Sequence, residues 1–209
     1  MHAVDKVMTM TWGMCHDMPA SDEQTYRPGQ AIPMDGLTRH EICIVVNGQT
    51  YTLTVPSRRT LLDLLRDELG LTGTKKVCDM GHCGACTALR DGVPVLSCLT
   101  LAVACDGCTI TTIEGLVGED GRLTPVQQAF IQCDALQCGF CTPGQIMSAT
   151  ALLRQNPDPS DEEIVHYMAG NLCRCGAYRG IFEAVRLASR IMSGAEKAPP
   201  TEYRHGEGS

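Results

Sequence analysis

The sequence has few aromatic residues, no long apolar run and no excess of positive charge. Phe, Trp and Tyr make up 4% of its 209 residues, so a base-stacking platform for nucleic acid is not expected. The net charge of −7 argues against nucleic-acid binding as well. No apolar run reaches the roughly 18 residues that a membrane-spanning helix needs. The glycine-rich phosphate loops of nucleotide-binding proteins are also missing, so no nucleotide site of that kind is expected.

Cysteine, in contrast, is abundant, with thirteen in the chain. A chain of this length does not need disulfides to hold its core together, and the stretch Met1–Met14 lacks the apolar centre of a secretory signal. Many cysteines in a reducing compartment point to metal binding or catalysis rather than to disulfides. The spacing of the cysteines is therefore the most informative feature of the sequence.

One group of cysteines follows the pattern C-x4-C-x2-C, with a fourth cysteine after eleven intervening residues; its members are Cys78, Cys83, Cys86 and Cys98. This is the plant-type ligand spacing of a [2Fe–2S] cluster. Gly81 and Gly84 lie between the first three cysteines and permit the tight turns of a loop wrapped around a cluster. Structural zinc is the main alternative, but zinc usually pairs two short Cys/His hooks.

The residues around this loop predict a small mixed sheet with one helix. Asn47-Gly48 and Asp91-Gly92 each separate two β-rich runs and predict hairpins. A helix is expected from Thr60, with Asp63 as its capping-box partner, to a stop at Gly70. The expected strands are 42–46, 51–55, 87–90, 93–96 and 109–113.

The second half of the chain predicts four helices. Thr124-Pro125 and Thr142-Pro143 each fit an N-cap followed by proline at the first helical position. Ser160 and Glu163 fit a capping box, and apolar spacing predicts a last helix over about 176–192. Four helices in about 70 residues favour a compact bundle.

A second group of cysteines precedes two of these helix starts; its members are Cys138, Cys141, Cys173 and Cys175. Helix N-termini present free N–H groups and a positive dipole end, which favour thiolates. Two such starts meeting in a bundle would form a second four-sulfur site. Zinc remains open for this group on spacing alone, although C-x-C is a poorer zinc hook than C-x2-C.

Five cysteines lie outside both groups. Cys43 is expected as a small buried filler in a strand, and Cys133 as a packed residue at the end of a helix. Cys105 and Cys108 form a C-x2-C pair, which we interpret as a turn with two free thiols rather than a zinc hook or redox pair. The Cys15-His16 pair is interpreted as a surface coincidence rather than a metal hook.

Three separated motifs together resemble one known family. They are Thr72–Lys76 with the first cysteine loop, Gln-Cys-Gly-Phe-Cys-Thr-Pro-Gly at Gln137–Gly144, and Gly-Asn-Leu-Cys-Arg-Cys at Gly170–Cys175. In this order, over about residues 40–192, they closely resemble the iron–sulfur subunit of the xanthine oxidase (molybdenum hydroxylase) family. The stretches 98–103 and 110–116 look most like the small subunits of bacterial aldehyde oxidoreductases.

The resemblance implies an α+β fold, with an N-terminal β-grasp domain of the plant-type ferredoxin kind followed by an all-α four-helix-bundle [2Fe–2S] domain. Together with the patterns above, it divides the chain into five parts. These are an N-terminal extension (1–39), a ferredoxin-like domain (40–116), a linker (117–123), a four-helix-bundle domain (124–194) and a tail expected to be disordered (195–209).

The resemblance also assigns residues to cofactors. The first group, Cys78, Cys83, Cys86 and Cys98, would ligate a ferredoxin-type [2Fe–2S] cluster. The second group, Cys138, Cys141, Cys173 and Cys175, would ligate the bundle cluster. Gln137 and Cys175 would contact molybdopterin. Val77 and His82 depart from the family pattern without removing a ligand, and His82 is expected to be a solvent-facing loop residue.

The implied function is electron transfer within a molybdenum-dependent oxidoreductase, with no substrate chemistry on this chain. Molybdopterin and FAD would lie on partner chains, a large molybdopterin subunit and a FAD-binding subunit, in a heterotrimer or its dimer. Electrons would pass from molybdopterin through the bundle cluster and the ferredoxin-type cluster to flavin or an external acceptor. The expected substrate is an aldehyde. Alternatives are an N-heterocycle or xanthine-type substrate, a stand-alone two-cluster carrier, and a zinc module.

The cellular compartment is predicted by comparison with periplasmic relatives, which carry a twin-arginine leader at the start of this subunit. The Arg58-Arg59 pair of this chain lies inside the first domain and does not form such a leader. We therefore expect the cytoplasm, with the periplasm as the alternative if a leader was removed.

Overall fold

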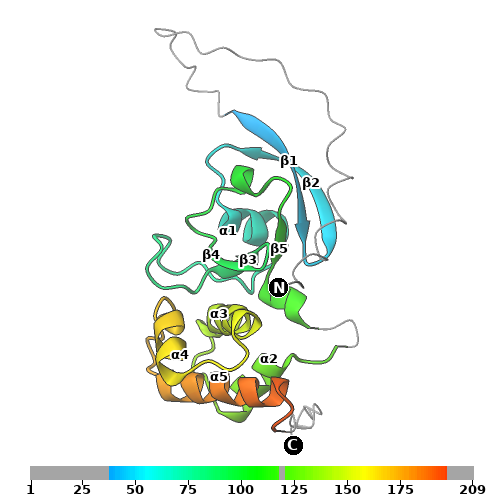
Figure 1. The fold of residues 1–209 in the computed structure, drawn as a ribbon. Coiled ribbons are helices and arrows are strands. Elements are labelled where there is room, and N and C mark those ends of the chain that lie inside the picture. Colours follow the sequence, from blue (N-terminus) through cyan, green and yellow to red (C-terminus); the bar gives the residue numbers. More distant parts are fainter. Residues whose placement is uncertain (1–37, 118–120, 197–209) are drawn as a thin grey trace, which may run out of the picture.

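The computed structural model describes residues 38–117 and 121–196, which form a sheet-containing half followed by a helical half (Figure 1). Nearly all of the predicted N-terminal extension, with the Cys15-His16 pair, lies outside the described residues, and so does most of the predicted tail. No helix within the described ranges is long and apolar enough to cross a membrane.

The first half is built on a mixed sheet of five strands in the order β2-β1-β5-β3-β4. Strand β1 runs antiparallel to β2 and parallel to β5, while β3 runs antiparallel to β4 and β5. The prediction of a small mixed sheet is confirmed. The strands are β1 (Arg39–Val46), β2 (Gln49–Pro56), β3 (Thr87–Arg90), β4 (Val93–Leu96) and β5 (Thr109–Thr111).

Both predicted hairpins form, and their turns have the expected backbone. Asn47 and Gly48 have φ of 51° and 82°, and Asp91 and Gly92 have φ of 52° and 81°. Two successive positive φ angles match the right-handed twist of the strands, and Asn, Asp and Gly tolerate them best. The run 42–46 differs from the prediction in one respect: its burial alternates, so Cys43 is half-buried on the face opposite Ile42.

The predicted helix after Thr60 forms, but with a different geometry. One α-turn, α1 (Leu61–Asp63), passes directly into a π-helical turn, η1 (Leu64–Glu68), closed by the Leu69 amide on the Leu64 carbonyl at 3.1 Å. The wider turn accompanies the complete burial of a run of leucines, Leu61, Leu62, Leu64 and Leu65. One of the two hydrogen bonds of the predicted capping box forms: the Asp63 amide donates to the Thr60 hydroxyl at 3.1 Å. The Asp63 carboxylate instead accepts a hydrogen bond from Nζ of Lys76 at 2.8 Å.

The last strand of the sheet is shorter than predicted. It ends at Thr111, and Ile113–Leu116 forms a 3-10 turn, η3. The Asn47 side chain explains the early end, because its Oδ1 accepts from the Thr112 amide and its Nδ2 donates to Thr112 Oγ1, both at 2.9 Å. A second 3-10 turn, η2 (Ala102–Cys105), precedes the strand.

All four predicted helices of the second half are present. The capping boxes of α2 (Thr124 with Gln127) and α4 (Ser160 with Glu163) are complete. The N-terminal ends of two helices differ from the prediction. The N-cap of α3 is Cys141, and α5 begins at Tyr178, because Gly176 has φ of 79° and cannot belong to a right-handed helix. The helices are α2 (Pro125–Gln132), α3 (Thr142–Gln155), α4 (Asp161–Met168) and α5 (Tyr178–Met192).

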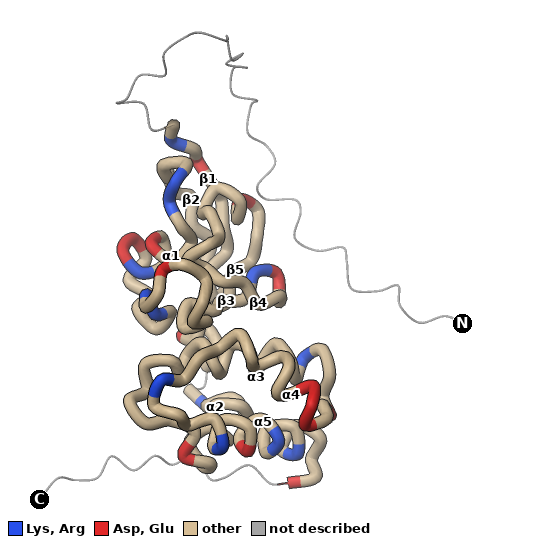
Figure 2. Tube along the Cα trace, turned by 90° about the vertical axis from the view of Figure 1, so that its left-hand side faces the viewer, with Lys and Arg blue, Asp and Glu red and all other residues tan. Residues whose placement is uncertain are grey.

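The two halves pack against each other through β3 and α3. Alternation along β3 places Ala88 in the core of the sheet half and Leu89 in the core of the helical half, and both are fully buried. Helix α3 contains one charged residue, Arg154, close to its C-terminal end. Figure 2 accordingly shows the trace where the halves meet as mostly uncharged, with the charges of the helical half concentrated on α4 and α5.

Candidate metal centres

The first cysteine group lies on the loop between η1 and β3 and on the turn after β4. Cys86 directly precedes β3, and Cys98 follows β4, which pairs with β3. The Ser97 hydroxyl donates to the Cys86 carbonyl at 2.7 Å and fixes the two cysteine-bearing ends together. The hairpin thus returns Cys98 to the loop, as the sequence predicted.

The loop turns back on itself at residues with positive φ. Gly81 and Gly84 have φ of 77° and 70°, which confirms the conformational role expected of them. Asp79, with φ of 55°, adds a third such turn that the sequence analysis did not anticipate. The folded loop aims backbone donors at sulfur, and the exposed His82 donates its amide to Sγ of Cys78 at 3.3 Å.

The thiols of the first group differ in their electrostatics. The amide of Met80, helped by donors from Cys83 and His82, lowers the pKa of Cys78 to about 6. Burial, followed by the neighbouring thiol of Cys86, raises the pKa of Cys98 to about 12. Cys86 and Cys98 pack around the fully buried Leu62. An unpaired thiolate is costly in such a place, so the loop favours a bound cation that deprotonates its cysteines.

The second group lies at the starts of α3 and α5. Cys138 and Cys141 precede α3, while Cys173 and Cys175 lie in the turn before α5. The Phe140 amide, and then the Cys175 thiol, lower the pKa of Cys138. Burial, followed by the thiol of Cys173, raises the pKa of Cys141 to about 11.

Further donors lie beside the second group. The Ala177 amide donates to Sγ of Cys173 at 3.4 Å, as expected for a sulfur near a helix N-terminus. The Thr142 hydroxyl is buried without a hydrogen-bond partner, so it is available to a sulfur ligand. The donor set therefore fits a cofactor bound through sulfur.

The strongest thiol–thiol interactions behind these pKa shifts link the eight cysteines in pairs. The pairs are Cys78 with Cys83, Cys86 with Cys98, Cys138 with Cys175, and Cys141 with Cys173. Within the described ranges, no three His, Cys, Asp or Glu side chains surround a point where a single metal ion would bind. Two pairs in each half suit a [2Fe–2S] cluster, in which four thiolates divide between two irons.

The two cysteine groups are joined by buried polar residues that the sequence analysis did not single out. Asn171, Gln145 and Ser148 are each at most 5% exposed, and Asn171 hydrogen-bonds across to Gly84 of the first loop. Gln145 and Ser148 lie three positions apart, on one face of a helix with few charged residues, and this spacing is a signal that could have indicated such a contact.

The outer edge of the second group is open to solvent. Gln137, Cys138 and Cys175 are exposed, so the two residues predicted to contact molybdopterin lie on an accessible surface. Exposed apolar side chains lie within or next to the cysteine-bearing segments of both groups; they are Val77, Met80, Leu99, Leu101, Phe140, Leu172 and Tyr178. Exposed apolar residues gathered around a site are typical of a surface covered by a partner.

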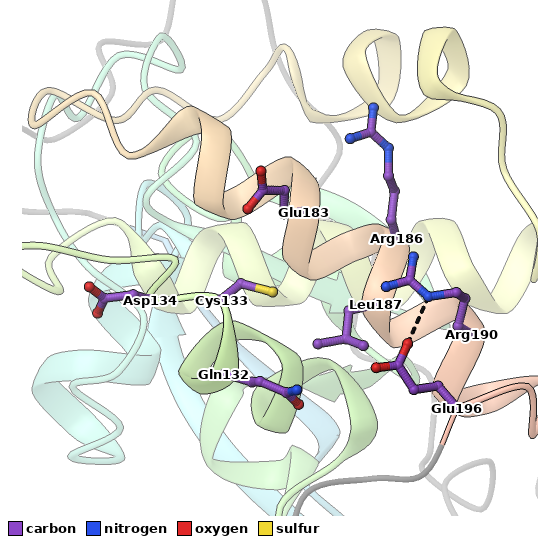
Figure 3. A pocket seen from close by; sticks show the side chains of 8 residues that line it. All are labelled: Gln132, Cys133, Asp134, Glu183, Arg186, Leu187, Arg190 and Glu196. Carbon is purple, nitrogen blue, oxygen red and sulfur yellow. Dashed lines mark hydrogen bonds and ion pairs between the residues drawn. The ribbon is translucent and has the colours of Figure 1, made fainter.

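A separate surface pocket of about 520 Å³ lies where the end of α2 meets α5 (Figure 3). Acidic and basic side chains alternate around it, and Arg190 pairs with Glu196 at 2.8 Å. None of its lining residues belongs to the two cysteine groups. They are Gln132, Cys133, Asp134, Glu183, Arg186, Leu187, Arg190 and Glu196.

The remaining described cysteines are free thiols. Cys105 is fully buried at the end of η2, and Cys108 lies one turn further on. Burial raises the pKa of Cys105, Cys133 and Cys108, that of Cys108 to about 11. The half-buried Cys133 packs against the core of the helical half, as predicted.

Comparison with known proteins identifies both halves. The family model of the 2Fe-2S iron-sulfur cluster binding domain matches residues 44–103, and that of the [2Fe-2S] binding domain matches residues 112–186. The nicotine 6-hydroxylase small subunit of Paenarthrobacter nicotinovorans is 54% identical over 147 residues, which cover 70% of this chain and 88% of that protein. The iron-sulfur-binding subunit of Escherichia coli aldehyde oxidoreductase is 47% identical, with 71% of each chain covered.

Solved structures agree. The crystal structure of quinoline 2-oxidoreductase from Pseudomonas putida 86 contains a chain that is 45% identical, with a TM-score of 0.69, covering 75% of this chain and 98% of that chain. The aldehyde oxidoreductase of Desulfovibrio desulfuricans is 40% identical with a TM-score of 0.72, and this chain covers 18% of that chain. The chain belongs to the iron–sulfur subunits of the molybdenum hydroxylase family, and it is an electron-transfer subunit of an oxidoreductase.

Proposed function

We propose that this chain links a molybdopterin subunit to a flavin subunit or an external acceptor, through two [2Fe–2S] clusters held by the two cysteine groups. The observation that carries the proposal is the presence of four cysteines in each half, within the residues matched by the two [2Fe–2S] domain models, with the thiols of each half interacting in two pairs. The clusters supply one-electron redox chemistry, which suits a link between two-electron cofactors. The chain's own residues hold the clusters apart and supply hydrogen bonds to their sulfurs.

The ligand assignment follows the pairs. Cys78 with Cys83 and Cys86 with Cys98 would each hold one iron of the ferredoxin-type cluster. The other two pairs would hold the irons of the second cluster. Backbone donors to sulfur, such as the amides of His82 and Ala177, then stabilise the charge of the clusters and tune their reduction potentials.

The proposed clusters also support an assignment of domain types and boundaries to the two halves. Residues 40–116 form a β-grasp, plant-type ferredoxin-like domain, and helices α2–α5 within 124–194 form the four-helix bundle. Residues 117–123 connect them. A cytoplasmic location stays a prediction, and fractionation of cells that produce the complex tests it.

The open edge at Gln137 and Cys175 is the side we assign to molybdopterin. Both residues are exposed, and the exposed Phe140, which directly precedes Cys141, supports a covering partner there. On this assignment the large subunit covers the second cysteine group. The apolar residues beside the first group, Leu99 among them, are then left for the flavin subunit or another acceptor.

The substrate pocket lies on the large subunit, so this chain does not select the substrate. The relatives include an aldehyde oxidoreductase subunit and also the small subunits of a nicotine 6-hydroxylase and a nicotinate dehydrogenase. An aldehyde substrate stays our prediction, with an N-heterocycle as the alternative. Turnover of the purified complex with one compound of each class separates the two.

The proposal is tested by composition and partners together. The purified chain should be coloured and contain about four irons and four acid-labile sulfides for two clusters. Tagged chain should carry a large molybdenum-containing subunit through purification. A colourless, iron-free chain would overturn the cluster assignment, and an iron-loaded chain that purifies alone would favour the stand-alone carrier.

A further inference from the structure

The two cysteine loops meet at one buried side chain, that of Asn171, which is 5% exposed. Its Nδ2 donates to the carbonyl oxygen of Gly84 at 2.9 Å and to Oγ1 of Thr87 at 3.3 Å. Its Oδ1 accepts from the hydroxyl of Ser148 at 2.7 Å. Nε2 of Gln145 donates to the backbone carbonyl of Asn171 at 2.9 Å. Asn171 thus connects the first cysteine loop and helix α3 to its own segment.

Each of these segments also carries proposed cluster ligands. Gly84 lies inside the first cysteine loop, and Asn171 precedes Cys173 by two residues. Ser148 lies on α3, whose N-cap is Cys141. The hydrogen bonds of Asn171 therefore join the backbone that holds one cluster to two segments that hold the other.

The backbones at this contact touch directly. A Cβ atom on Gly84 would overlap the carbonyl oxygen of Gly170, and one on Gly144 would lie 2.5 Å from the Gly84 carbonyl oxygen. Because backbone cannot move aside as a flexible side chain can, the two loops have no slack toward each other. The Asn171 hydrogen bonds, with that from the Leu172 amide to the Cys83 carbonyl, keep the two loops from moving apart.

Loss of the Asn171 amide would leave a buried hydroxyl unpaired. The Ser148 hydroxyl would lose its acceptor, while the Gly84 carbonyl would keep the amide and the hydroxyl of Thr87, at 3.1 and 2.7 Å. Burying an unsatisfied polar group costs about 1–3 kcal/mol, so the loops are expected to separate or to admit water. Either response loosens the contact.

We propose that Asn171 is a positioning residue for electron transfer, because it fixes the separation of the two cysteine loops and hence of the clusters that they hold. The inference rests on the proposed function, in which each cysteine group binds one [2Fe–2S] cluster. The step concerned moves one electron: one cluster is oxidised, the other is reduced, and no bond forms or breaks. Since tunnelling rates fall steeply with distance, a looser contact slows this step.

The test compares three variants of the complete complex. Asn171→Ala removes the amide, and Ser148→Ala removes one of its partners and is the milder change. Asn156→Ala is the matched control, because that amide bonds Glu163 on the exposed surface at 3.2 Å. Each complex is assayed for iron, for the magnetic interaction between the two reduced clusters by EPR, and for the rate of inter-cluster electron transfer after rapid reduction.

Both Asn171→Ala and Ser148→Ala should keep full iron and both EPR signals, but show a weaker magnetic interaction and slower transfer, with the smaller effect in Ser148→Ala. Asn156→Ala should match the unsubstituted complex. An unchanged interaction in iron-loaded Asn171→Ala overturns the inference. If Asn171→Ala loses iron, the magnetic interaction in iron-loaded Ser148→Ala is used instead, and an unchanged interaction there overturns the inference. Loss of iron in both variants also overturns the inference. Lack of iron in the unsubstituted complex would instead overturn the proposed function.

Discussion

The amide of Leu172 donates a hydrogen bond to the carbonyl oxygen of Cys83, with an N···O distance of 2.9 Å. Leu172 directly precedes Cys173, so this bond joins the backbones of the two cysteine groups across the contact between the halves. The cation–π contact of Lys75 with Phe140, 5.8 Å from Nζ to the ring centroid, joins the sheet half to the other segment of the second group, the one before α3. The iron–sulfur domains are therefore parts of one packed unit, with their cysteine loops against each other.

The first prediction concerns the sorting of the ligands. Cys98→Ser should remove the EPR signal of the ferredoxin-type cluster and leave the other, while Cys138→Ser should do the reverse. The reason is that the pKa of Cys98 is shifted by the thiols of Cys86 and Cys78, and that of Cys138 by the thiol of Cys175, all within their own groups. EPR of the fully reduced complex measures both signals, and Cys133→Ser serves as a control that keeps both. Loss of both signals from one ligand substitution would show that the grouping is wrong.

A second prediction tests the close contact of the halves. Gly144→Ala should destabilise the protein by about 1–3 kcal/mol, the usual cost of overpacking, because its Cβ would meet the backbone of Gly84 and Ala85. Alanine is favoured over glycine in a helix by up to about 1 kcal/mol, so the clash outweighs the gain. Denaturant unfolding of the iron-loaded protein measures the difference.

Gly170→Ala is the matched control for this prediction, because a Cβ there has no atom within 4 Å. It should unfold close to the unsubstituted protein. Equal stability of Gly144→Ala and Gly170→Ala would mean that the halves are less tightly packed than the structure indicates.

A third prediction concerns the molybdopterin contact. Gln137→Ala should keep iron content and both EPR signals, because Gln137 is exposed and is not a proposed ligand. Molybdenum content or turnover of the purified complex should fall, since the amide would no longer bond the cofactor of the large subunit. Gln132→Ala, an exposed glutamine at the end of α2, should change neither. Unaltered molybdenum content and turnover in Gln137→Ala would remove this residue from the cofactor site.

A fourth prediction follows from burial of the free thiols. Burial raises the pKa of Cys108 from 9.0 to about 11, so at pH 8 its thiolate fraction is about a hundredfold lower than that of an ordinary cysteine. Because the thiolate is the nucleophile, alkylation of Cys108 should be slow at pH 8 and should accelerate as the pH rises toward 11. Mass spectrometry of the alkylated protein measures the rate, and the urea-unfolded chain is the reference. Equal rates in the folded and unfolded chains at pH 8 would contradict the raised pKa.

The sequence predicted local structure well where one residue imposes a backbone conformation. Asn47-Gly48 and Asp91-Gly92 set two hairpins, and Thr124 and Ser160 began two helices. These features depend on residues adjacent in the chain, so their patterns are visible without the fold. The turns of the first cysteine loop belong to the same class, because Gly81 and Gly84 within it set them.

Predictions based on propensity alone were less accurate at the ends of elements. Thr142-Pro143 matched a helix start, but the helix begins one residue earlier, since proline is tolerated anywhere in a first turn whose amides have no helical partner. Strand β5 ends early because Asn47, far away in the sequence, takes the hydrogen bonds of Thr112. The π-turn after Asp63 likewise depends on the core that buries its leucines.

The sequence by itself determined the order of the elements and the hairpin and helix signals, because each arises from neighbouring residues, while the assignment of the cysteines to two clusters stays its prediction. The tertiary structure decided which thiols interact and how the two loops meet. Asn171 lies 87 residues from Gly84 along the chain, and its hydrogen bond exists because the packing of β3 against α3 brings both segments together. Contacts of this kind depend on the packing of distant segments, which no local pattern records.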